Sequence, residues 1–389
     1  MHTCHTEIGA FDTLLLQRYD IYRIEICNKN IIEGLSVMGK RVTLQEIADA
    51  LGMSRNTVSR ALNNSGSVSS ETRSKICQMA TAMGYKQFSL VDTADTASST
   101  LSVLKDGKTE IALFTHSFPG ASHSGTKLLE AFQNRIDSLG YKLSINIIKD
   151  NDIESLSLPT NFSMDNIAGI LCIELFSEKY SQFLCSLNIP ILFVDTPVLQ
   201  KFGLAADTLY MENVTSVYRL ISSFIQSGKR NISFVGDRFH CQSFNERWQA
   251  YVSAMTDSGI GIDTGSCILD DDSSPYKDTD YLAARISELG KMPEVFFCAN
   301  DYLAICTIKA LRQLGKKVPK DVEVCGFDNA PEATIIEPSL TTVKIHSSSM
   351  GFIAADILLS RIANPNTPYR KTYVETDIII RESTGNTIK

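Results

Sequence analysis

One stretch near the start of the chain reads Val42-Thr-Leu-Gln-Glu-Ile-Ala-Asp-Ala-Leu-Gly-Met-Ser-Arg-Asn-Thr-Val-Ser-Arg-Ala-Leu-Asn-Asn64. It predicts two short helices joined by a tight turn. Thr43 can cap the first helix, and Glu46, three residues later, can complete a capping box. Gly52 tolerates the positive φ that a sharp turn requires. Ser54 can then cap a second helix that begins directly after it.

Each of these two helices carries an apolar side and a polar side. The apolar residues recur at helical spacing, so that the helices can pack on each other; they are Leu44, Ile47, Ala48, Leu51, Val58, Ala61 and Leu62. The polar side of the second helix presents Arg55, Asn56, Ser59 and Arg60. Arginine suits the edge of guanine and asparagine that of adenine, while hydroxyls and helix N-termini hold phosphates. The pattern indicates a helix-turn-helix DNA reader.

The charge around this stretch differs in sign from that of the whole chain. Residues 40–90 contain seven Lys and Arg against three Asp and Glu, a balance of +4, whereas the chain carries −7. Such a local excess of basic residues is typical of a nucleic-acid footprint. Composition alone would also fit a small helical bundle with a solvated charged face, but the motif in register favours DNA binding.

Four pieces together resemble the headpiece of the LacI/GalR family of bacterial transcription repressors. They are Val42-Thr-Leu-Gln-Glu-Ile-Ala, Gly52-Met-Ser-Arg-Asn-Thr-Val-Ser-Arg-Ala-Leu-Asn, Val68-Ser-Ser-Glu-Thr-Arg and Met83-Gly-Tyr. The resemblance implies a repressor that binds operator DNA as a homodimer or tetramer, under the control of a small molecule. The DNA-binding positions that it implies are Thr43, Leu44, Ser54, Arg55, Asn56, Thr57, Ser59, Arg60, Asn63, Thr72 and Arg73.

Length and composition are those of an ordinary globular protein. The chain has 389 residues, of which 43% are hydrophobic, enough for two or three domains. Its ten cysteines are scattered, and five of them, in apolar runs, are expected in the core; they are Cys172, Cys185, Cys298, Cys306 and Cys325. This usage predicts a reducing cytoplasm and neither a disulfide scaffold nor a metal site. No apolar run reaches the roughly 18 residues of a transmembrane helix.

Two segments flank the headpiece. Residues 1–37 have no capped, strongly periodic element and no basic run before an apolar core, so they do not read as a secretory signal. We expect a disordered extension that operator binding does not need; Met38-Gly-Lys-Arg would make a normal start for the headpiece.

Residues 87–109 read as a linker rich in Ser and Thr. Relatives carry a hinge helix there with a Pro-Asn pair, where this chain has Gln87-Phe88. Both an unstructured tether and a displaced hinge helix over Leu101–Lys105 remain open.

From Glu110 onward, short apolar strands alternate with helices. Strands are expected at 111–114, 143–148, 167–173, 191–194, 232–235, 295–298 and 322–325, and helices at 128–139, 217–227, 248–255 and 305–314. Continuous apolar strands between helices indicate parallel sheets that are covered on both faces. The expected fold is therefore an all-α helix-turn-helix headpiece at 38–86 and an α/β core at 110–389. Two doubly wound parallel-sheet subdomains form this core, with a ligand crevice at the carboxyl ends of their strands.

This core resembles the periplasmic-binding-protein-like part of the same family. Matching pieces are Cys298-Ala-Asn-Asp-Tyr-Leu-Ala, Val318-Pro-Lys-Asp-Val-Glu-Val-Cys-Gly-Phe-Asp-Asn, Leu340-Thr-Thr-Val and Arg381-Glu-Ser-Thr. The resemblance implies a domain that dimerises and binds an effector, here a sugar or sugar derivative. Met211-Glu-Asn departs from the Asp-Asn that is usual in the family.

Six residues are candidates for binding this effector: Asp301, Asp195, Ser243, Asn245, Arg247 and Ser124. Asp301 and Asp195 each end a buried strand, where a carboxylate can accept hydrogen bonds from sugar hydroxyls. Asp301 could instead cap a helix that begins at Tyr302, and Arg247 could be a structural ion-pair partner. Trp248 is expected in the core rather than as a platform for a sugar ring.

Enzyme chemistry finds no support in the sequence. It contains neither an H-E-x-x-H motif nor a G-x-S-x-G elbow, which zinc peptidases and α/β-hydrolases require, and no cofactor is expected. The main alternative is a sugar-binding protein of the periplasmic type without DNA function. It would share the core but would need a signal peptide and would lack the helix-turn-helix. We therefore expect a cytoplasmic protein whose partners are double-stranded operator DNA and a carbohydrate effector, and which has no membrane partner.

Overall fold

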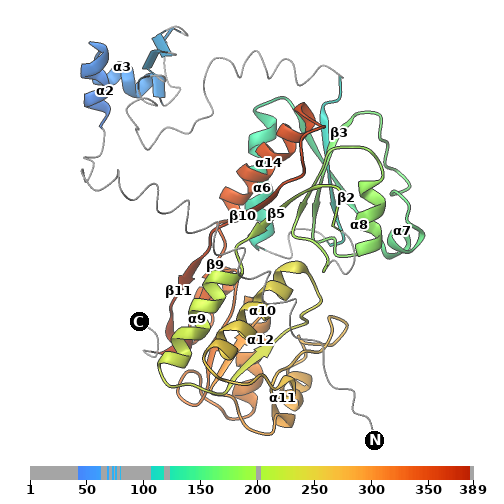
Figure 1. The fold of residues 1–389 in the computed structure, drawn as a ribbon, viewed down its shortest axis with the longest axis vertical. Coiled ribbons are helices and arrows are strands. Elements are labelled where there is room, and N and C mark those ends of the chain that lie inside the picture. The colour runs from blue at the N-terminus through green and yellow to red at the C-terminus, as the bar shows by residue number, and fades with distance from the viewer. Residues whose placement is uncertain are drawn as a thin grey trace, which may run out of the picture. The chain divides into compact units, whose positions relative to one another are not determined.

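The computed structural model describes residues 43–62, 68–69, 72–73, 75–76, 79, 107–117, 123–198 and 203–385 (Figure 1). The chain divides into two compact units, Met1–Ser99 and Thr100–Lys389. The predicted extension 1–37, Asn63 and the hinge candidate Leu101–Lys105 lie outside the described residues. Of the helices within the described ranges, none is long and apolar enough to cross a membrane.

In the first unit, the two predicted helices are α2 (Leu44–Leu51) and α3 (Arg55–Leu62). The predicted capping box is confirmed: the backbone N–H of Glu46 donates to Thr43 Oγ1, and the backbone N–H of Thr43 donates to the Glu46 carboxylate at 2.8 Å. Gly52 ends α2 with φ 64°. The turn therefore depends on the residue that the sequence pattern assigned to it.

A small core holds this unit together. The buried residues are Ile47, Ala48, Val58, Ala61 and Ile76, with Leu44, Leu51, Met53, Val68 and Met79 packed against them. The predicted apolar sides of both helices thus face each other, and Ile76 adds a third contact from the chain beyond them.

The second unit consists of two lobes. The first lobe is built on a six-stranded sheet with the strand order β10-β5-β4-β3-β1-β2, and every neighbouring pair in it is parallel. Its strands are β1 (Glu110–Thr115), β2 (Lys142–Ile147), β3 (Ile167–Ile173), β4 (Ile191–Val194), β5 (Asp207–Met211) and β10 (Lys371–Val374). Its helices are α6 (His123–Asp137), α7 (Asp150–Ser155), α8 (Glu178–Cys185) and α14 (Ser347–Ala363).

The second lobe has a smaller parallel sheet, with the order β6-β7-β8, and an antiparallel pair, β9 with β11. Its strands are β6 (Ile232–Val235), β7 (Val295–Cys298), β8 (Glu323–Cys325), β9 (Thr342–Lys344) and β11 (Asp377–Ile379). Its α-helices are α9 (Val214–Gln226), α10 (Gln242–Asp257), α11 (Thr279–Glu288), α12 (Asp301–Gln313) and α13 (Glu332–Ile335); η3 (Thr264–Ser266) and η4 (Glu382–Thr384) are 3-10 helices.

The predicted α/β core is confirmed, but its halves are unequal. The predicted strands and helices all occur, and Trp248 is buried against Phe234 and Tyr251 as expected. Beyond the prediction, α14 and β10 return to the first lobe, where β10 becomes an edge strand on β5. The chain therefore crosses between the lobes three times, after β5, after β9 and after β10.

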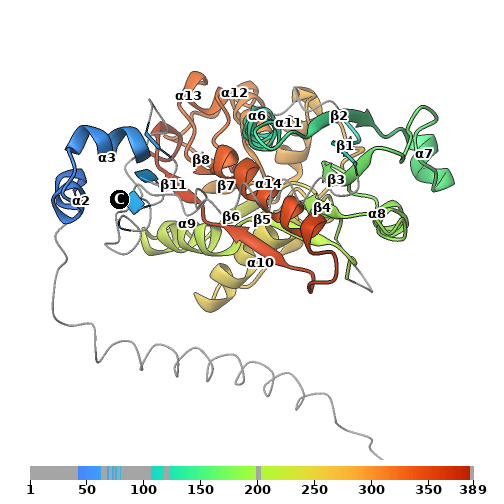
Figure 2. The same ribbon diagram turned by 90° about the horizontal axis from the view of Figure 1, so that it is seen from above.

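Helices cover both faces of the first sheet, as Figures 1 and 2 show. Side chains of α6 and α14 pack on one face, and side chains of α8 pack on the other. A buried ion cluster fixes the far end of α14: Asp207 accepts hydrogen bonds from Arg361 at 2.9 and 3.0 Å and from Arg370 at 3.2 Å. Although burial by itself would raise it, these hydrogen bonds hold the pKa of Asp207 below its usual value.

The start of α14 depends on a close approach to α6. A Cβ placed on Gly351 would lie 2.2 Å from the carbonyl oxygen of Leu128 and 2.8 Å from the Cβ of Ala131. Only glycine allows the two helices to lie this close. Since backbone atoms of α6 form the contact, they cannot move aside as a flexible side chain could.

We therefore expect Gly351→Ala to destabilise the protein by about 1–3 kcal/mol, a typical cost of overpacking. The matched control is Gly261→Ala, because a Cβ on Gly261 meets nothing within 4 Å. Urea unfolding of both variants measures the difference. Equal unfolding midpoints would show that the α6–α14 contact can relax without cost.

Candidate DNA-binding face and effector crevice

The outer side of α3 presents the side chains that the sequence assigned to base reading. Arg55, Asn56 and Arg60 are exposed, and Ser59 is half-buried. Ser54 caps the helix, since its Oγ accepts a hydrogen bond from the backbone N–H of Thr57 at 3.0 Å. A short helix with a polar outer side and a capped N-terminus has the form of a recognition helix.

The remaining DNA-binding candidates are spread over the other elements of this unit. Thr43 is exposed at the start of α2, whereas Leu44 packs partly against the core. Thr72 donates its backbone N–H to Ser69 Oγ, and Arg73 is half-buried. Asn63 lies outside the described residues.

In the second unit, Asp195 joins the two lobes. It follows β4 in the first lobe with φ 61°, in the left-handed region. Its carboxylate accepts the backbone N–H of Ser243 at 3.2 Å, in the first turn of α10 in the second lobe. The N-cap residue of α10, Cys241, makes no side-chain cap of its own, so a carboxylate from the other lobe serves this helix N-terminus.

Arg247 lies in the interior of the second lobe, with 2% of its surface exposed. Its Nε donates to Asn213 Oδ1 at 2.9 Å and its Nη1 to the carbonyl oxygen of Ala299 at 2.6 Å. The guanidinium lies 3.6 Å from the centre of the Phe327 ring and 3.8 Å from Asp328. The expected structural alternative for Arg247 therefore has direct support, since it braces three segments.

Asp301 is also buried, with 1% exposed. Its carboxylate accepts Thr342 Oγ1 at 2.6 Å and the backbone N–H of Ala330 at 2.8 Å, so both oxygens have internal partners. Burial, together with the charge of Asp328, raises its pKa to about 8. This geometry does not support the prediction that Asp301 binds the effector, because both of its carboxylate oxygens are occupied by groups of the protein itself. The alternative, a cap for a helix beginning at Tyr302, is wrong, because Asn300 caps a helix that begins at Asp301.

Asp328 is the carboxylate that the sequence reasoning missed. Its side chain is 27% exposed, and it lies beyond β8 with φ 116°. Burial raises its pKa to about 6; Arg247 opposes that shift, while Glu174 and Asp195 add to it. The signal was present in Gly326-Phe-Asp-Asn, shortly after an apolar strand, by the same rule that selected Asp195.

Asn245 and Ser124 have other positions. Asn245 Nδ2 donates to the carbonyl oxygen of Arg238 at 3.2 Å, so Asn245 braces the loop before α10. Ser124 lies in the first turn of α6, but its side chain is outside what the structure describes.

Unusual backbone conformations gather at this crevice. Glu174, Asp195, Asp328 and Asn329 all have positive φ, and each of them follows a strand that ends there. Strained residues of this kind persist where the surrounding structure holds them, and they cluster at functional sites. The carboxyl ends of the strands therefore form the candidate effector site.

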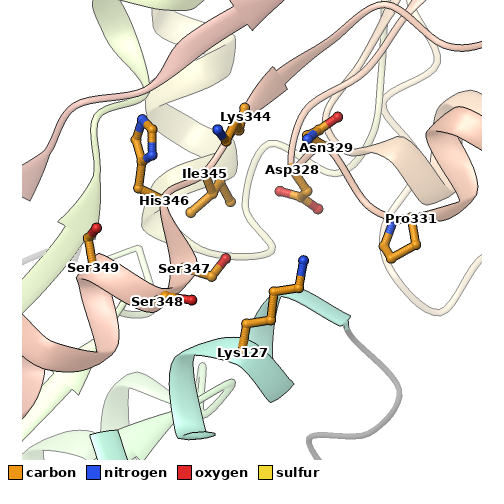
Figure 3. A pocket seen from close by; sticks show the side chains of 10 residues that line it. All are labelled: Lys127, Asp328, Asn329, Pro331, Lys344, Ile345, His346, Ser347, Ser348 and Ser349. Atoms are coloured by element: carbon orange, nitrogen blue, oxygen red, sulfur yellow. The ribbon is translucent and has the colours of Figure 1, made fainter. Parts of the chain in front are cut away.

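A cavity of about 260 Å³ adjoins Asp328 (Figure 3). It is lined by Lys127, Asp328, Asn329, Pro331, Lys344, Ile345, His346, Ser347, Ser348 and Ser349. The lining takes residues from α6 and α14 in the first lobe and from the β8 and β9 regions in the second. Of the five effector candidates whose side chains are described, none belongs to this lining, and Arg247 is the one that pairs with the lining residue Asp328.

A second cavity of about 470 Å³ lies in the second lobe. Its lining is more aromatic and comprises His240, Phe244, Asp272, Ser273, Ser274, Pro275, Tyr276, Lys277, Asn300, Tyr302 and Leu303.

The described residues contain no disulfide bond and no cluster of potential metal ligands. The seven cysteines described there are free; six are buried and Cys185 is half-buried. Burial raises the pKa values of their thiols, as expected for core residues. No group of three or more potential metal ligands gathers among the described residues.

Two protein families match this chain. The family described as "Bacterial regulatory proteins, lacI family" matches residues 43–87, and the "Periplasmic binding protein-like domain" matches residues 221–384. The first match covers the helix-turn-helix, which the periplasmic-type alternative lacks.

Bacterial transcriptional regulators match this chain over nearly their whole length. The probable HTH-type transcriptional repressor ExuR of Bacillus subtilis is 26% identical, over 88% of this chain and 98% of its own. The HTH-type transcriptional regulator GntR of Escherichia coli K12 is 28% identical, over 83% and 92%.

Solved structures share the fold. A complex of the transcriptional regulator CelR with cellobiose superposes with a TM-score of 0.62 at 22% identity, over 88% of this chain and 100% of that one. The lac repressor dimer bound to operator and the anti-inducer ONPF gives 0.61 at 20% identity, over 89% and 99%. The chain therefore carries a DNA-binding domain of the lacI family of bacterial regulatory proteins at residues 43–87 and a periplasmic-binding-protein-like domain at residues 221–384, and the relatives that it resembles over most of its length are transcriptional regulators.

Proposed function

We propose that this protein is a cytoplasmic, homodimeric repressor whose affinity for its operator is controlled by a carbohydrate bound between the lobes of its second unit. In this proposal, residues 38–86 bind DNA, residues 87–109 link, and residues 110–389 dimerise and bind the effector. The observation that carries the proposal is a partly exposed carboxylate, Asp328, held beside a buried arginine at the edge of an interlobe cavity.

The chemistry of Asp328 suits sugar hydroxyls. A carboxylate accepts two or more hydrogen bonds, and such charge-assisted bonds are among the strong ones. Arg247 lies 3.8 Å away and limits the rise that burial causes in the pKa of Asp328; the resulting value of about 6 leaves the carboxylate mainly ionised at neutral pH. CelR is a structural neighbour that was solved with cellobiose, and a curated relative is the ribose operon repressor of Haemophilus influenzae.

The control of DNA binding follows from the position of the crevice. A ligand shifts an equilibrium only if it binds one arrangement of the protein better than another. The cavity takes its lining from both lobes, so a ligand within it favours one spacing of the lobes. The neighbouring lac repressor structure holds a dimer, an operator and a small molecule together.

For base reading, we expect Asn56→Ala and Arg60→Ala each to reduce discrimination between operator and random DNA by about 1–3 kcal/mol. Both side chains are exposed on α3, and one such helix covers only a half-site. Selection from random duplexes should therefore yield an inverted repeat, and fluorescence anisotropy then compares the variants on both DNAs. If affinity falls equally for operator and random DNA, the two residues contact the phosphate backbone of the DNA rather than its bases.

For the effector, we expect Asp328→Asn to weaken binding of the carbohydrate at least tenfold, since a hydrogen bond to a charged group is worth about 1.5–3 kcal/mol. A thermal-shift screen of sugars and sugar derivatives on the full chain identifies the ligand, and calorimetry gives its affinity. Asp301→Asn is the matched control: a buried carboxylate in the same neighbourhood whose partners are internal. Loss of binding in Asp301→Asn alone would return the ligand role to Asp301.

For Asp301 we propose a structural role with its own dependence on pH. In the folded protein its pKa is about 8, against a usual value of 3.8, so folding retains a proton that the unfolded chain releases. The resulting stabilisation is complete below pH 3.8 and is lost as the pH rises towards about 8.

We expect the stability of the wild type, relative to Asp301→Asn, to fall steadily between pH 5 and pH 8, because asparagine has no proton to release. Urea midpoints of both proteins at pH 5, 6.5 and 8 provide the measurement. A difference that does not change with pH would show that Asp301 titrates normally.

A further inference from the structure

The N-terminus of α14 opens on the interlobe cavity without a cap from the protein. His346 occupies the N-cap position but makes no side-chain cap bond. Met350 is the first residue of this turn whose backbone N–H finds an acceptor, the carbonyl oxygen of His346; among the described residues, those of Ser347, Ser348 and Ser349 find none. A helix of 17 residues thus directs its positive dipole end and three free N–H groups towards the cavity.

Ser347 gives an independent sign that a polar ligand belongs there. Only 7% of this residue is exposed, yet its hydroxyl has no hydrogen-bond partner within the described part of the chain. It lines the cavity, and Figure 3 shows it pointing into the same space as Lys127. The rest of the residue is buried, so its hydroxyl is held at the cavity wall, where it can form a hydrogen bond with a ligand.

Two lysines add positive charge to this end of the cavity. Lys127, on α6, and Lys344, at the end of β9, both belong to the lining. Within the described residues, neither lysine side chain has an ion-pair or hydrogen-bond partner. His346 is different, because it pairs with Asp377 at 3.0 Å. The cavity thus combines two free ammonium groups, a hydroxyl and a helix N-terminus, which together suit an anion.

The opposite side of the cavity has the reverse character. Asp328 and Asn329 line it from the second lobe (Figure 3), and Asp328 is the carboxylate assigned above to sugar hydroxyls. A ligand that bridges the lobes would therefore present hydroxyls to one side and negative charge to the other. The volume of about 260 Å³ is near the lower end of ordinary ligand pockets, which start at about 300 Å³, and favours a monosaccharide.

From this arrangement we infer that the effector is an anionic monosaccharide, either a sugar acid or a sugar phosphate. Its carboxylate or phosphate binds the first turn of α14, Ser347 and Lys127, with Lys344 nearby, while its hydroxyls donate to Asp328. This inference rests on the proposed carbohydrate-controlled function and specifies the chemical class of the carbohydrate. Because Lys127 and Asp328 belong to different lobes, a doubly contacted ligand also draws the lobes together.

The test compares each acid with its neutral parent on the full-length protein. The ligand pairs for calorimetry are glucuronate with glucose and galacturonate with galactose; glucose 6-phosphate distinguishes a phosphate site from a carboxylate site. Inorganic phosphate shows whether the anion binds without the sugar. We expect at least one acid or phosphate ester to bind ten or more times as tightly as its neutral parent, with an affinity that falls as salt rises.

The variants assign this preference to residues. Lys127→Met removes the charge of an exposed side chain, so that folding is preserved, and should reduce the affinity for the anionic ligand about tenfold while leaving the neutral parent unchanged. Ser347→Ala should give a smaller loss, about threefold. Lys179→Met is the control, because Lys179 is an exposed lysine on α8 in the same lobe and should change neither affinity.

Three results would overturn the inference in distinguishable ways. If neutral sugars bind as tightly as their acids, the site does not recognise an anion, although the carbohydrate-controlled function stands. If Lys127→Met retains the full preference for the acid, the anion binds elsewhere. If none of the sugars, neutral or anionic, binds the protein, the proposed function itself fails and the inference falls with it.

Discussion

The buried guanidinium of Arg247 is the contact on which the crevice depends. It reaches the chain crossing after β5 through Asn213, the end of β7 through the carbonyl oxygen of Ala299, and the segment after β8 through Phe327 and Asp328. A buried arginine is tolerable only when its donors are satisfied and a countercharge is near. Each of these segments must therefore hold its place for the arginine to remain buried, and together they define the second-lobe side of the crevice.

The three chain crossings form the second constraint, because they tie the lobes without fusing them. The backbone N–H of Glu212 donates to the carbonyl oxygen of Val374, Thr376 Oγ1 donates to the carbonyl oxygen of Glu212, and His346 pairs with Asp377. These contacts lie side by side along the crossings, whereas the lobes have separate cores. Separate cores joined by a few short segments favour hinge closure. Asp195, whose carboxylate serves the N-terminus of α10 in the other lobe, is a contact that such closure would alter.

Charge is divided within the crevice. Carboxylates gather at the strand ends, where Glu174 and Asp195 raise the pKa of Asp328, and the lysines stand beside the uncapped start of α14. That division arises because α14 returns to the first lobe after the chain has built most of the second. Its N-terminus consequently faces the strand ends of the other lobe. A small ligand with hydroxyls and one acidic group would complement both the carboxylate side and the lysine side of the crevice.

The sequence by itself determined the headpiece and the alternation of strands and helices. Capping, the glycine turn and the apolar sides of α2 and α3 are local, so residues within a few positions of each other decide them. The same holds for the buried strands of the core, whose apolar runs are continuous. Asp195 and Ser243, which the sequence placed at a strand end and at a helix start, do meet across the lobes.

Only the tertiary structure decided which carboxylate meets the cavity. Asp301 and Asp328 each follow a buried strand, and no local pattern separates them; Asp301 is enclosed by Thr342 and Ala330, whereas Asp328 emerges beside Arg247. The return of α14 and β10 to the first lobe was likewise invisible. Parallel pairing of β10 with β5 joins residues more than 160 positions apart, and the close fit of Gly351 on α6 joins helices more than 200 apart. Burial and partners at such separations depend on the whole packed chain, and a local window of sequence does not contain them.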